Sequence, residues 1–347
     1  MTELRVDLDA LEANIDAVRG AVGAAELMLV VKDDAYGHGL GPVSRRAHDA
    51  GVRWFGAYDI ETGSELRRAL GPGIRIFVWM AASGEAMERA VAHDLDIGIG
   101  DAETLEAVAQ AGARSGRAAR VHLKIDTGLH RNGVRPEEWP QFVRRAREHE
   151  IAGRIEMIGV WSHIAEASDA EDDLARSAFD EAVHEASAAG LRPRLRHLSA
   201  SAASLARPEF RYDLVRVGAF CFGIRPAGGP SEAELGIRPI AALQAPVTSV
   251  DGDRATVGIG RLDGLPSTLA GRVSVGTPAG PRSLLEVGAD STVENWPGAA
   301  PGDVVTIWGP GEQQEGSATD LAEAIGTIGE ELAVRVSPLV PRSYVGE

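Results

Sequence analysis

Cysteine is nearly absent from this chain of 347 residues, which contains only Cys221. One cysteine cannot form an internal disulfide, so a reducing cytoplasm is the expected compartment. The chain also lacks an apolar run that could span a membrane, and its first residues carry charge where a signal peptide needs an apolar segment. Basic residues are outnumbered, with 35 Lys and Arg against 51 Asp and Glu and a formal charge of −16. This excess disfavours nucleic acids and anionic membranes as partners, because both bind basic surfaces.

What the sequence does contain is an alternation of short apolar runs and longer helical patterns. Its 44% hydrophobic and 25% charged residues allow a sizeable core. Helical stretches include 101–114, with Asp101 as N-cap, and 168–189, with Ser168 as N-cap. Eight β-type segments are expected at 27–31, 53–57, 75–79, 95–99, 120–125, 155–161, 195–198 and 214–217. This alternation predicts an α/β fold, a (β/α)₈ TIM-type barrel, with an open doubly wound sheet as the rival arrangement.

The amino-acid composition of the sequence changes after about residue 226. Pro and Gly become frequent, as in RPAGGP and NWPGAAPGD, and the runs between them are short and β-like, as in DVVTIW. The change predicts a barrel domain over residues 10–226 and a mainly β domain over residues 227–347. The β-like segment 4–8 precedes the first barrel helix, so residues 1–9 are assigned to the β domain, with whose strands they could pair.

The segment LMLVVKDDAYGHG places Lys32 at the end of a buried apolar strand. Partial desolvation at a barrel mouth lowers the pKa of a lysine, and an uncharged amine is what attacks an aldehyde to form a Schiff base. Taken alone, Lys32 could equally be a lysine that extends from a strand end into solvent.

Polar groups also follow the later strands, at the edge where barrel enzymes place their active sites. In chain order these groups are Lys124, Arg131, His163, His197, Ser201, Arg216, Gly218 and Ala219. Phosphates bind barrels after strands seven and eight. The hydroxyl of Ser201 and the backbone N–H groups of Gly218 and Ala219 therefore predict a phosphate site.

Two of these segments resemble the alanine racemase family, pyridoxal 5′-phosphate (PLP) enzymes with a barrel and a C-terminal β domain. VKDDAYGHG is similar to the family's motif V-K-A-N/D-A-Y-G-H-G, and HLKIDTGLHRNG is similar to H-L-K-x-D-T-G-M-x-R-x-G. Both motifs are long, occur in order and fall on the expected strands. The resemblance covers residues 4–226 and, more weakly, the rest of the chain.

The resemblance implies a role for each matched residue. Lys32 is the Schiff-base lysine and the base on the D side of Cα. Arg131, the second catalytic residue, faces the substrate carboxylate and the cofactor hydroxyl, a role that suits its planar guanidinium. Lys124, which is often carbamylated in the family, orients Arg131 toward the substrate.

Other matches bind the cofactor. An arginine facing the pyridine nitrogen keeps that nitrogen unprotonated, which makes the ring a weaker electron sink. This arginine is Arg216, supported by His163. The residues implied at the phosphate are Tyr36, Ser201, Gly218 and Ala219.

The chain departs from the family at the second catalytic base. In the family this base is a tyrosine of the partner subunit's β domain, in a segment like S-Y-G-x-x-Y. None of the tyrosines of this chain lies between residues 213 and 343; they are Tyr36, Tyr58, Tyr212 and Tyr344. Arg261 and Leu265 replace the tyrosines of the family segment I-G-Y-A-D-G-Y. Glu330 replaces a tyrosine that contacts the phosphate, and Ala200 replaces an asparagine.

These features favour a PLP-dependent isomerase that interconverts L- and D-alanine, or another small amino acid, in a homodimer. Its second-base chemistry would be altered, with His130 or a residue of the partner's region 251–290 in place of the tyrosine. One alternative is a protein with one-sided lyase or aldolase chemistry, or a non-catalytic regulator that binds the cofactor. A third hypothesis, metal-assisted hydrolysis with His163 and His197 as ligands, lacks the usual spacing of metal ligands, so no metal is expected.

Overall fold

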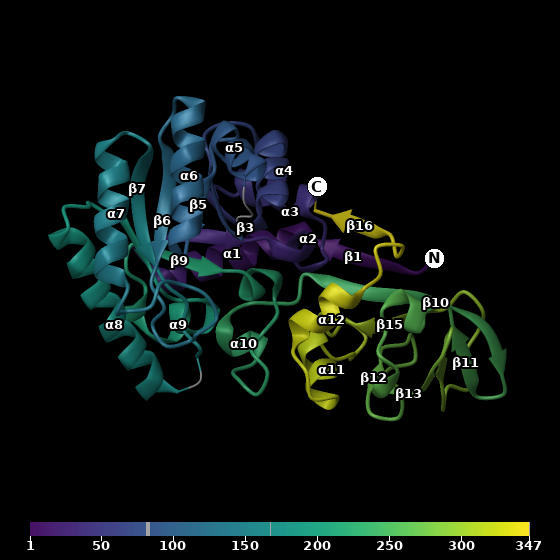
Figure 1. Cartoon of the computed structure of the whole chain (residues 1–347). Coiled ribbons are helices and arrows are strands. Elements are labelled where there is room, and N and C mark those ends of the chain that lie inside the picture. The colour runs from purple at the N-terminus through teal and green to yellow at the C-terminus, as the bar shows by residue number, and fades with distance from the viewer. Residues whose placement is uncertain (81–83, 167, 347) are drawn as a thin grey trace. The chain divides into compact units, whose positions relative to one another are not determined.

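The computed structural model describes residues 1–80, 84–166 and 168–346, and the chain divides into two compact units (Figure 1). The barrel unit comprises Arg19–Lys32 and Gly51–Gly218. The β unit comprises Met1–Val18, Asp33–Ala50 and Ala219–Glu347. No helix of the described residues is long and apolar enough to cross a membrane.

The barrel unit is built on eight parallel strands in the order β8-β7-β6-β5-β4-β3-β2-β9. The strands are β2 (Glu26–Val30), β3 (Trp54–Asp59), β4 (Arg75–Met80), β5 (Asp96–Ile99), β6 (Ala119–Lys124), β7 (Ile155–Trp161), β8 (Leu195–His197) and β9 (Leu214–Val217). The two ends of this order meet, because the Asp213 N–H donates to the Arg196 carbonyl at 3.2 Å and the Arg196 N–H donates to the Asp213 carboxylate at 2.8 Å. The predicted TIM-type barrel is therefore confirmed, and each predicted β segment overlaps an observed strand.

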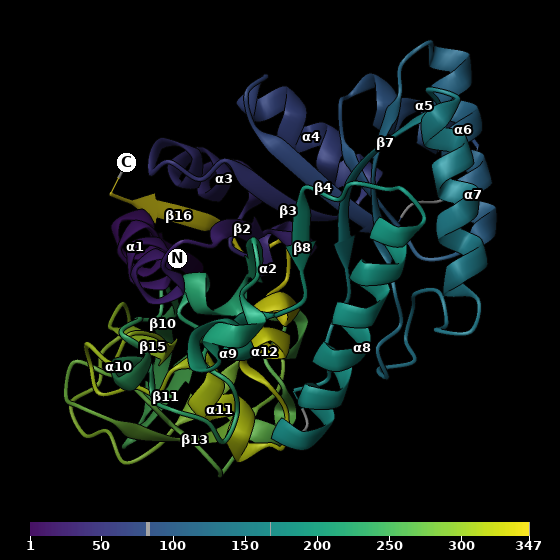
Figure 2. The same cartoon turned by 90° about the vertical axis from the view of Figure 1, so that its left-hand side faces the viewer.

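Helices alternate with these strands and lie outside them (Figures 1 and 2). They are α4 (Ile60–Leu70), α5 (Glu85–Ala92), α6 (Ala102–Ser115), α7 (Trp139–Ile151), α8 (Asp169–Ala188) and the short α9 (Ser201–Ala206). The predicted N-caps are confirmed, because the side chains of Asp101 and Ser168 accept from backbone N–H groups one turn on. A buried cluster includes Met28, Trp54, Phe77, Ile158, Trp161 and Leu214 from five of the strands.

The β unit contains a sheet in the order β12-β13-β14-β11-β10-β1-β16, with β15 paired to β10. Its strands are β1 (Glu3–Asp7), β10 (Ala241–Asp251), β11 (Arg254–Val257), β12 (Ser274–Val275), β13 (Arg282–Val287), β14 (Ser291–Val293), β15 (Val304–Trp308) and β16 (Arg342–Val345). Strand β1 pairs antiparallel with β10 and parallel with β16. The N-terminal segment thus joins the C-terminal sheet, as its β-like pattern suggested.

The β unit also contains helices. One is the N-terminal part of α1 (Leu8–Val22), the helix expected after segment 4–8. The sequence pattern did not indicate the others, which are α3 (Leu40–Asp49), α10 (Glu232–Leu235), α11 (Ala318–Ala324) and α12 (Gly329–Arg335). A capping box explains the start of α11, because Ser317 and Asp320 each accept from the other's backbone N–H. Such short helices escape a search for helical periodicity, which needs a longer window.

Candidate active site

Lys32 stands at a backbone transition after β2. The Val31 N–H donates to the Gly56 carbonyl of β3 at 2.9 Å, which extends the barrel ladder to the residue before Lys32. The next four residues, 33–36, all have positive φ between 53° and 55° and form one turn of left-handed helix. A left-handed conformation costs a non-glycine residue about 1–2 kcal/mol, so four in succession need support from the fold. Part of that support is the Asp34 carboxylate, which accepts the Leu40 N–H at 2.7 Å.

Arg216 on β9 forms the centre of a buried polar network in the barrel. Its guanidinium donates to the carbonyls of Ser162, His197 and Leu198 at 2.7, 3.0 and 3.0 Å. Its Nη1 and Nη2 atoms also lie 3.0 Å from His197 Nδ1 and 3.3 Å from His163 Nδ1. Burial, and then the charge of a neighbouring arginine, lowers the pKa of Arg216 to about 9. His163, the residue predicted to support Arg216, therefore contacts it directly, and His197 contacts it as well.

The second lysine of the site, Lys124, ends β6 and is 5% exposed. Its ammonium lies 4.5 Å from the centre of the Trp161 ring, a cation–π contact. Burial, followed by the charges of Arg131 and Arg216, lowers the pKa of Lys124 to about 8. Roughly a tenth of this amine is therefore uncharged at pH 7.

Cationic side chains converge on His163. Burial lowers its pKa to about 3, and the charges that lower it further come from Arg216, Arg131, Lys124 and Lys32, in that order. These four groups follow or lie on three strands, β2, β6 and β9, and share one electrostatic environment within the barrel unit. A site of this kind keeps its imidazole neutral and favours a ligand that carries negative charge.

The residues predicted at the phosphate are divided between the two units. Ser201 begins α9 and Gly218 follows β9 in the barrel unit, whereas Tyr36 and Ala219 belong to the β unit. Within the β unit the ring centre of Tyr36 lies 4.9 Å from that of Phe222. Burial, and then the charge of Glu330, raises the pKa of Tyr36. The joint phosphate role of these residues stays a prediction.

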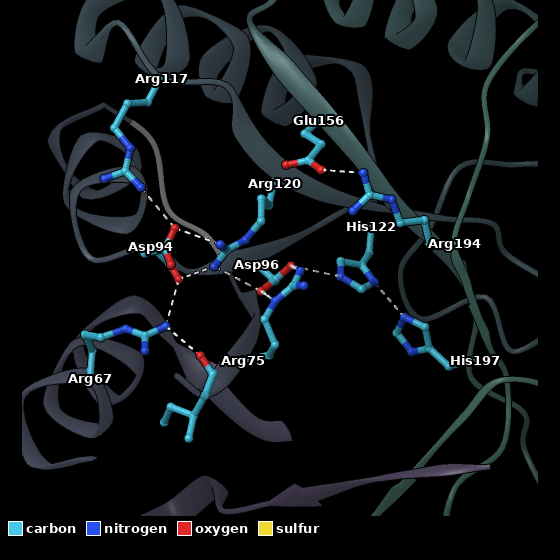
Figure 3. A network of polar contacts seen from close by, with 11 residues as sticks. Arg67, Arg75, Asp94, Asp96, Arg117, Arg120, His122, Glu156, Arg194 and His197 are labelled. Carbon is cyan, nitrogen blue, oxygen red and sulfur yellow. Dashed lines mark hydrogen bonds and ion pairs between the residues drawn. The ribbon is translucent and has the colours of Figure 1, made fainter. Parts of the chain in front are cut away.

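Two residues of the barrel network were missed by the sequence argument. His122 and Asp96 are fully buried and extend the contacts of His197 (Figure 3). His122 lies two residues before Lys124 in β6, so strand alternation places both side chains on the same face. That spacing in the HLK motif was the available signal, but nothing local pointed to Asp96.

A carboxylate near Arg216 was also missed. Glu166 accepts the Ala203 N–H at 2.8 Å, and its charge partly restores the pKa of Arg216. Its backbone is left-handed, with φ of 53°, and its own N–H donates to Asp172 at 3.2 Å. The sequence around it, SHIAEASD, contains no pattern that separates Glu166 from an ordinary loop residue.

A closed parallel barrel with a lysine, an arginine and a histidine at its strand ends defines a class of enzymes, those with the active site at the carboxyl ends of the strands. Two family models match the chain, "Alanine racemase, N-terminal domain" over residues 6–226 and "Alanine racemase, C-terminal domain" over residues 244–344. The chain belongs to the alanine racemase family.

Individual relatives agree over nearly the whole chain. The alanine racemase of Salinispora tropica is 37% identical, covering 99% of this chain and 98% of that protein. The alanine racemase of Beutenbergia cavernae is 38% identical, with 98% and 97% covered. Among solved structures, the alanine racemase of Streptomyces coelicolor A3(2) is 33% identical with a TM-score of 0.96, covering 100% of this chain and 98% of that one.

The region in which the resemblance implies a missing tyrosine lies in the β unit. Strands β10 and β11 are joined by Gly252 and Asp253 alone, with Asp251 paired to Arg254. The alignment with the Salinispora protein spans 383 positions against the 347 residues of this chain, so the relative contains segments that this chain lacks. Arg261 begins a short 3₁₀ turn and is exposed, whereas Leu265 is 4% exposed.

Proposed function

We propose that this chain is a PLP-dependent racemase that interconverts L- and D-alanine or another small amino acid. One observation carries the proposal: Lys32 follows a barrel strand in the same electrostatic environment as Arg131, the buried Arg216 and the partly buried His163. The full-length relatives, named alanine racemases, support this function over a non-catalytic cofactor-binding protein. His163 and His197, the side chains considered as metal ligands, both contact Arg216.

The donors of the site fit a pyridine nitrogen as well as a negative charge. The Nη hydrogens of Arg216 are directed to the chain's own carbonyls and imidazoles. The Nε–H of Arg216 forms no hydrogen bond within the described part of the chain, so it is the donor that a ligand would use. A guanidinium only donates, and it therefore suits a ring nitrogen that has no proton of its own.

Each residue then has a definite task. Lys32 would hold the cofactor covalently and would carry a proton to and from Cα on one face. Arg131 would bind the substrate carboxylate, and Arg216 would keep the ring nitrogen unprotonated. When bound, PLP withdraws electrons from Cα and makes its proton acidic. Tyr36, Ser201, Gly218 and Ala219 would hold the phosphate.

Lys124 is suited to carbamylation. Its lowered pKa of about 8 leaves uncharged amine available to react with carbon dioxide near neutral pH. The product would replace a buried cation with an anion beside Arg131 and Arg216, which removes like-charge repulsion. Incorporation of ¹³C-bicarbonate, followed by NMR and compared with Lys124→Ala, tests this assignment.

The family's second base belongs to a partner subunit, and on this basis we propose a homodimer. The predicted division into a barrel domain (10–226) and a β domain (227–347, with 1–9) is likewise a proposal, supported by family models that end at 226 and restart at 244. The cytoplasmic location stays a prediction from composition.

A borohydride experiment tests the cofactor assignment with unusual precision, because Lys32 and Lys124 are the only lysines of the chain. Reduction of the PLP-loaded protein and mass spectrometry of its peptides should place the added pyridoxyl group on Lys32. A label on Lys124, or no label, contradicts the assignment.

An exchange assay tests the reaction itself. L-alanine and D-alanine are incubated separately with the loaded protein in deuterated water. We expect inversion with deuterium at Cα, abolished in Lys32→Ala. Exchange without inversion would contradict the racemase and support one-sided chemistry through Lys32. If no small amino acid shows exchange or inversion, the proposed function is wrong.

A further inference from the structure

A line of buried polar side chains lies inside the barrel and ends at Arg216; Figure 3 shows its part from Asp96 through His122 to His197. From Arg216 Nη1 it runs 3.0 Å to His197 Nδ1, then 2.8 Å from His197 Nε2 to His122 Nδ1, then 3.4 Å from His122 Nε2 to Asp96 Oδ1. His122, His197 and Asp96 are each 0% exposed. His197 and His122 come from β8 and β6, which β7 separates in the sheet order, so their contact passes through the barrel interior, whereas Asp96 lies on β5 next to β6.

Both ends of this line have a fixed hydrogen-bonding role. Arg216 can only donate, because a guanidinium has no acceptor. Asp96 can only accept, because burial is outweighed by hydrogen bonds from His122 and Arg75 that hold its pKa at about 2. Arg75 bonds to both carboxylate oxygens, and its Nε–Oδ2 distance is 2.9 Å.

The fixed ends determine the tautomers of the two histidines between them. His197 Nδ1 must accept from Arg216, so its proton lies on Nε2 and is donated to His122 Nδ1. His122 must then carry its proton on Nε2 and donate it to Asp96. If either imidazole took up a second proton, one contact in the line would place two N–H donors opposite each other, with no acceptor between them. Burial also lowers the pKa of both histidines, which agrees with two neutral rings.

Packing around the imidazoles leaves them little freedom to turn. The Trp161 ring stacks on His197 at 5.8 Å with an interplanar angle of 8°. Opposite His122 stands Gly159, where a Cβ atom would lie 2.7 Å from His122 Nδ1. Phe77 lies edge-on to His197 at 5.4 Å. Gly159 leaves room for the His122 imidazole, and the rings of Trp161 and Phe77 restrict the rotation of the His197 imidazole.

We infer that Asp96 and His122 are positioning residues, which act through the single tautomer of His197 to hold the Arg216 guanidinium in one orientation. The consequence for a cofactor rests on the proposed function: the orientation keeps a donor facing the ring nitrogen, and loss of the line lets that nitrogen take up a proton. At the end of the line opposite Arg216, ion pairs hold Asp96 in place. Arg75 and Arg120 both form ion pairs with Asp96, and Arg120 also pairs with Asp94 at 2.7 Å.

The first test needs neither a variant nor a cofactor. Histidine ¹⁵N NMR of the purified full chain distinguishes the two neutral tautomers and the imidazolium. We expect His122 and His197 to be Nε2–H tautomers at neutral pH, with signals that do not titrate between pH 6 and 8. An Nδ1–H tautomer or an imidazolium at either position overturns the inference, whether or not the protein binds PLP.

The second test uses His122→Phe, which keeps a ring of similar size but removes the acceptor for His197. His149→Phe is the matched control: His149 is 1% exposed and bonds to Glu106 at 2.9 Å, but it lies in α7 outside the line. In His122→Phe we expect the His197 signals to move to a mixture of tautomers. With ¹⁵N-labelled PLP, the ring-nitrogen signal should move toward its protonated position, and kcat should fall about tenfold, as for other orienting contacts, with KM changed less than about twofold.

The outcomes separate a positioning role from a structural one. If His149→Phe produces the same ring-nitrogen shift, or His122→Phe produces none while remaining folded, the inference is wrong. If His122→Phe does not fold, Asp96→Asn provides the comparison, because its amide can donate to His122 Nε2 and reverse the line. An Asp96→Asn protein with unchanged His122 and His197 tautomers and an unchanged ring-nitrogen signal also contradicts it. Failure of PLP to bind overturns the proposed function, while the tautomer result still decides the histidine line.

Discussion

The barrel unit and the β unit differ in how firmly their candidate residues are held. In the barrel unit the buried Arg216 alone contacts three backbone carbonyls and two imidazoles. In the β unit Arg261, at a position where the resemblance implies a tyrosine, is exposed at the start of a 3₁₀ turn. The difference teaches which substitutions leave buried groups without a partner.

The physical reason is the cost of an unsatisfied buried group. Removing one partner from a buried hydrogen bond costs about 1–3 kcal/mol, so a change inside the barrel network propagates to its neighbours. Arg261 is exposed, and a substitution there leaves no buried group without a partner. A substitution at Arg261 should therefore cost little stability, whereas one at Arg216 should cost much more.

The largest expected effect is that of Arg216→Ala. It leaves three carbonyls and two imidazoles without their donor, and we expect the free energy of unfolding to fall by roughly 3 kcal/mol or more. Urea denaturation measures the loss. Arg261→Ala is the matched control and should stay within about 0.5 kcal/mol of the wild type. Equal losses of unfolding free energy in Arg216→Ala and Arg261→Ala would contradict the difference between the barrel unit and the β unit.

Acid should destabilise both units through histidines whose pKa the fold lowers, and His163 in the barrel unit and His38 in the β unit are the two test cases. Burial lowers the pKa of His163 to about 3 and that of His38 to about 4, below the usual value of 6.5. The unfolded chain binds protons below pH 6.5 and the folded chain does not, so stability falls as pH drops below 6.5. The expected loss is about 2 kcal/mol for each histidine at pH 5.

Unfolding midpoints in urea between pH 7 and 5 test this effect. His163→Gln and His38→Gln should each flatten the profile by a similar amount. A profile that keeps its slope in either variant would show that the corresponding histidine is not held neutral in the folded chain.

A smaller effect is expected for Glu330→Gln. Glu330 raises the pKa of Tyr36 through its negative charge, and the same charge should repel a phosphate held by Tyr36. Removing the charge should tighten PLP binding roughly fivefold, about 1 kcal/mol. Absorbance titration of PLP measures the change. Glu331→Gln is the neighbouring control, because Glu331 is exposed and pairs with Arg335; a similar gain there would refute a local effect.

The smallest effect concerns the tight turn between β10 and β11. Gly252 has φ of +63°, a conformation that costs other residues about 1 kcal/mol, so Gly252→Ala should lower stability by that amount. Gly20→Ala, within helix α1 and with no atom within 4 Å of the added Cβ, should raise it by about 0.5–1 kcal/mol. Thermal unfolding of the two variants gives the comparison, and changes of the same sign would contradict the turn assignment.

The fold was largely accessible from the sequence, and the site only in part. Strand segments such as 155–161 and 214–217 coincide with β7 and β9, because apolar runs bounded by turns are local signals. Lys32, Lys124 and Arg216 were found because they lie at the ends of such runs. The left-handed turn at 33–36 was not foreseen, since those four residues have no intrinsic preference for positive φ.

The sequence by itself determined the alternation of strands and helices, the strand-end position of the two lysines and the absence of a tyrosine between residues 213 and 343. Only the tertiary structure decided that Asp96, His122 and His197 form one line to Arg216. Such contacts depend on strand order, on register and on closure of the barrel, which bring together side chains far apart in the chain. The low dielectric of the interior then gives those contacts the strength to fix a tautomer and to lower the pKa of Lys124 and His163.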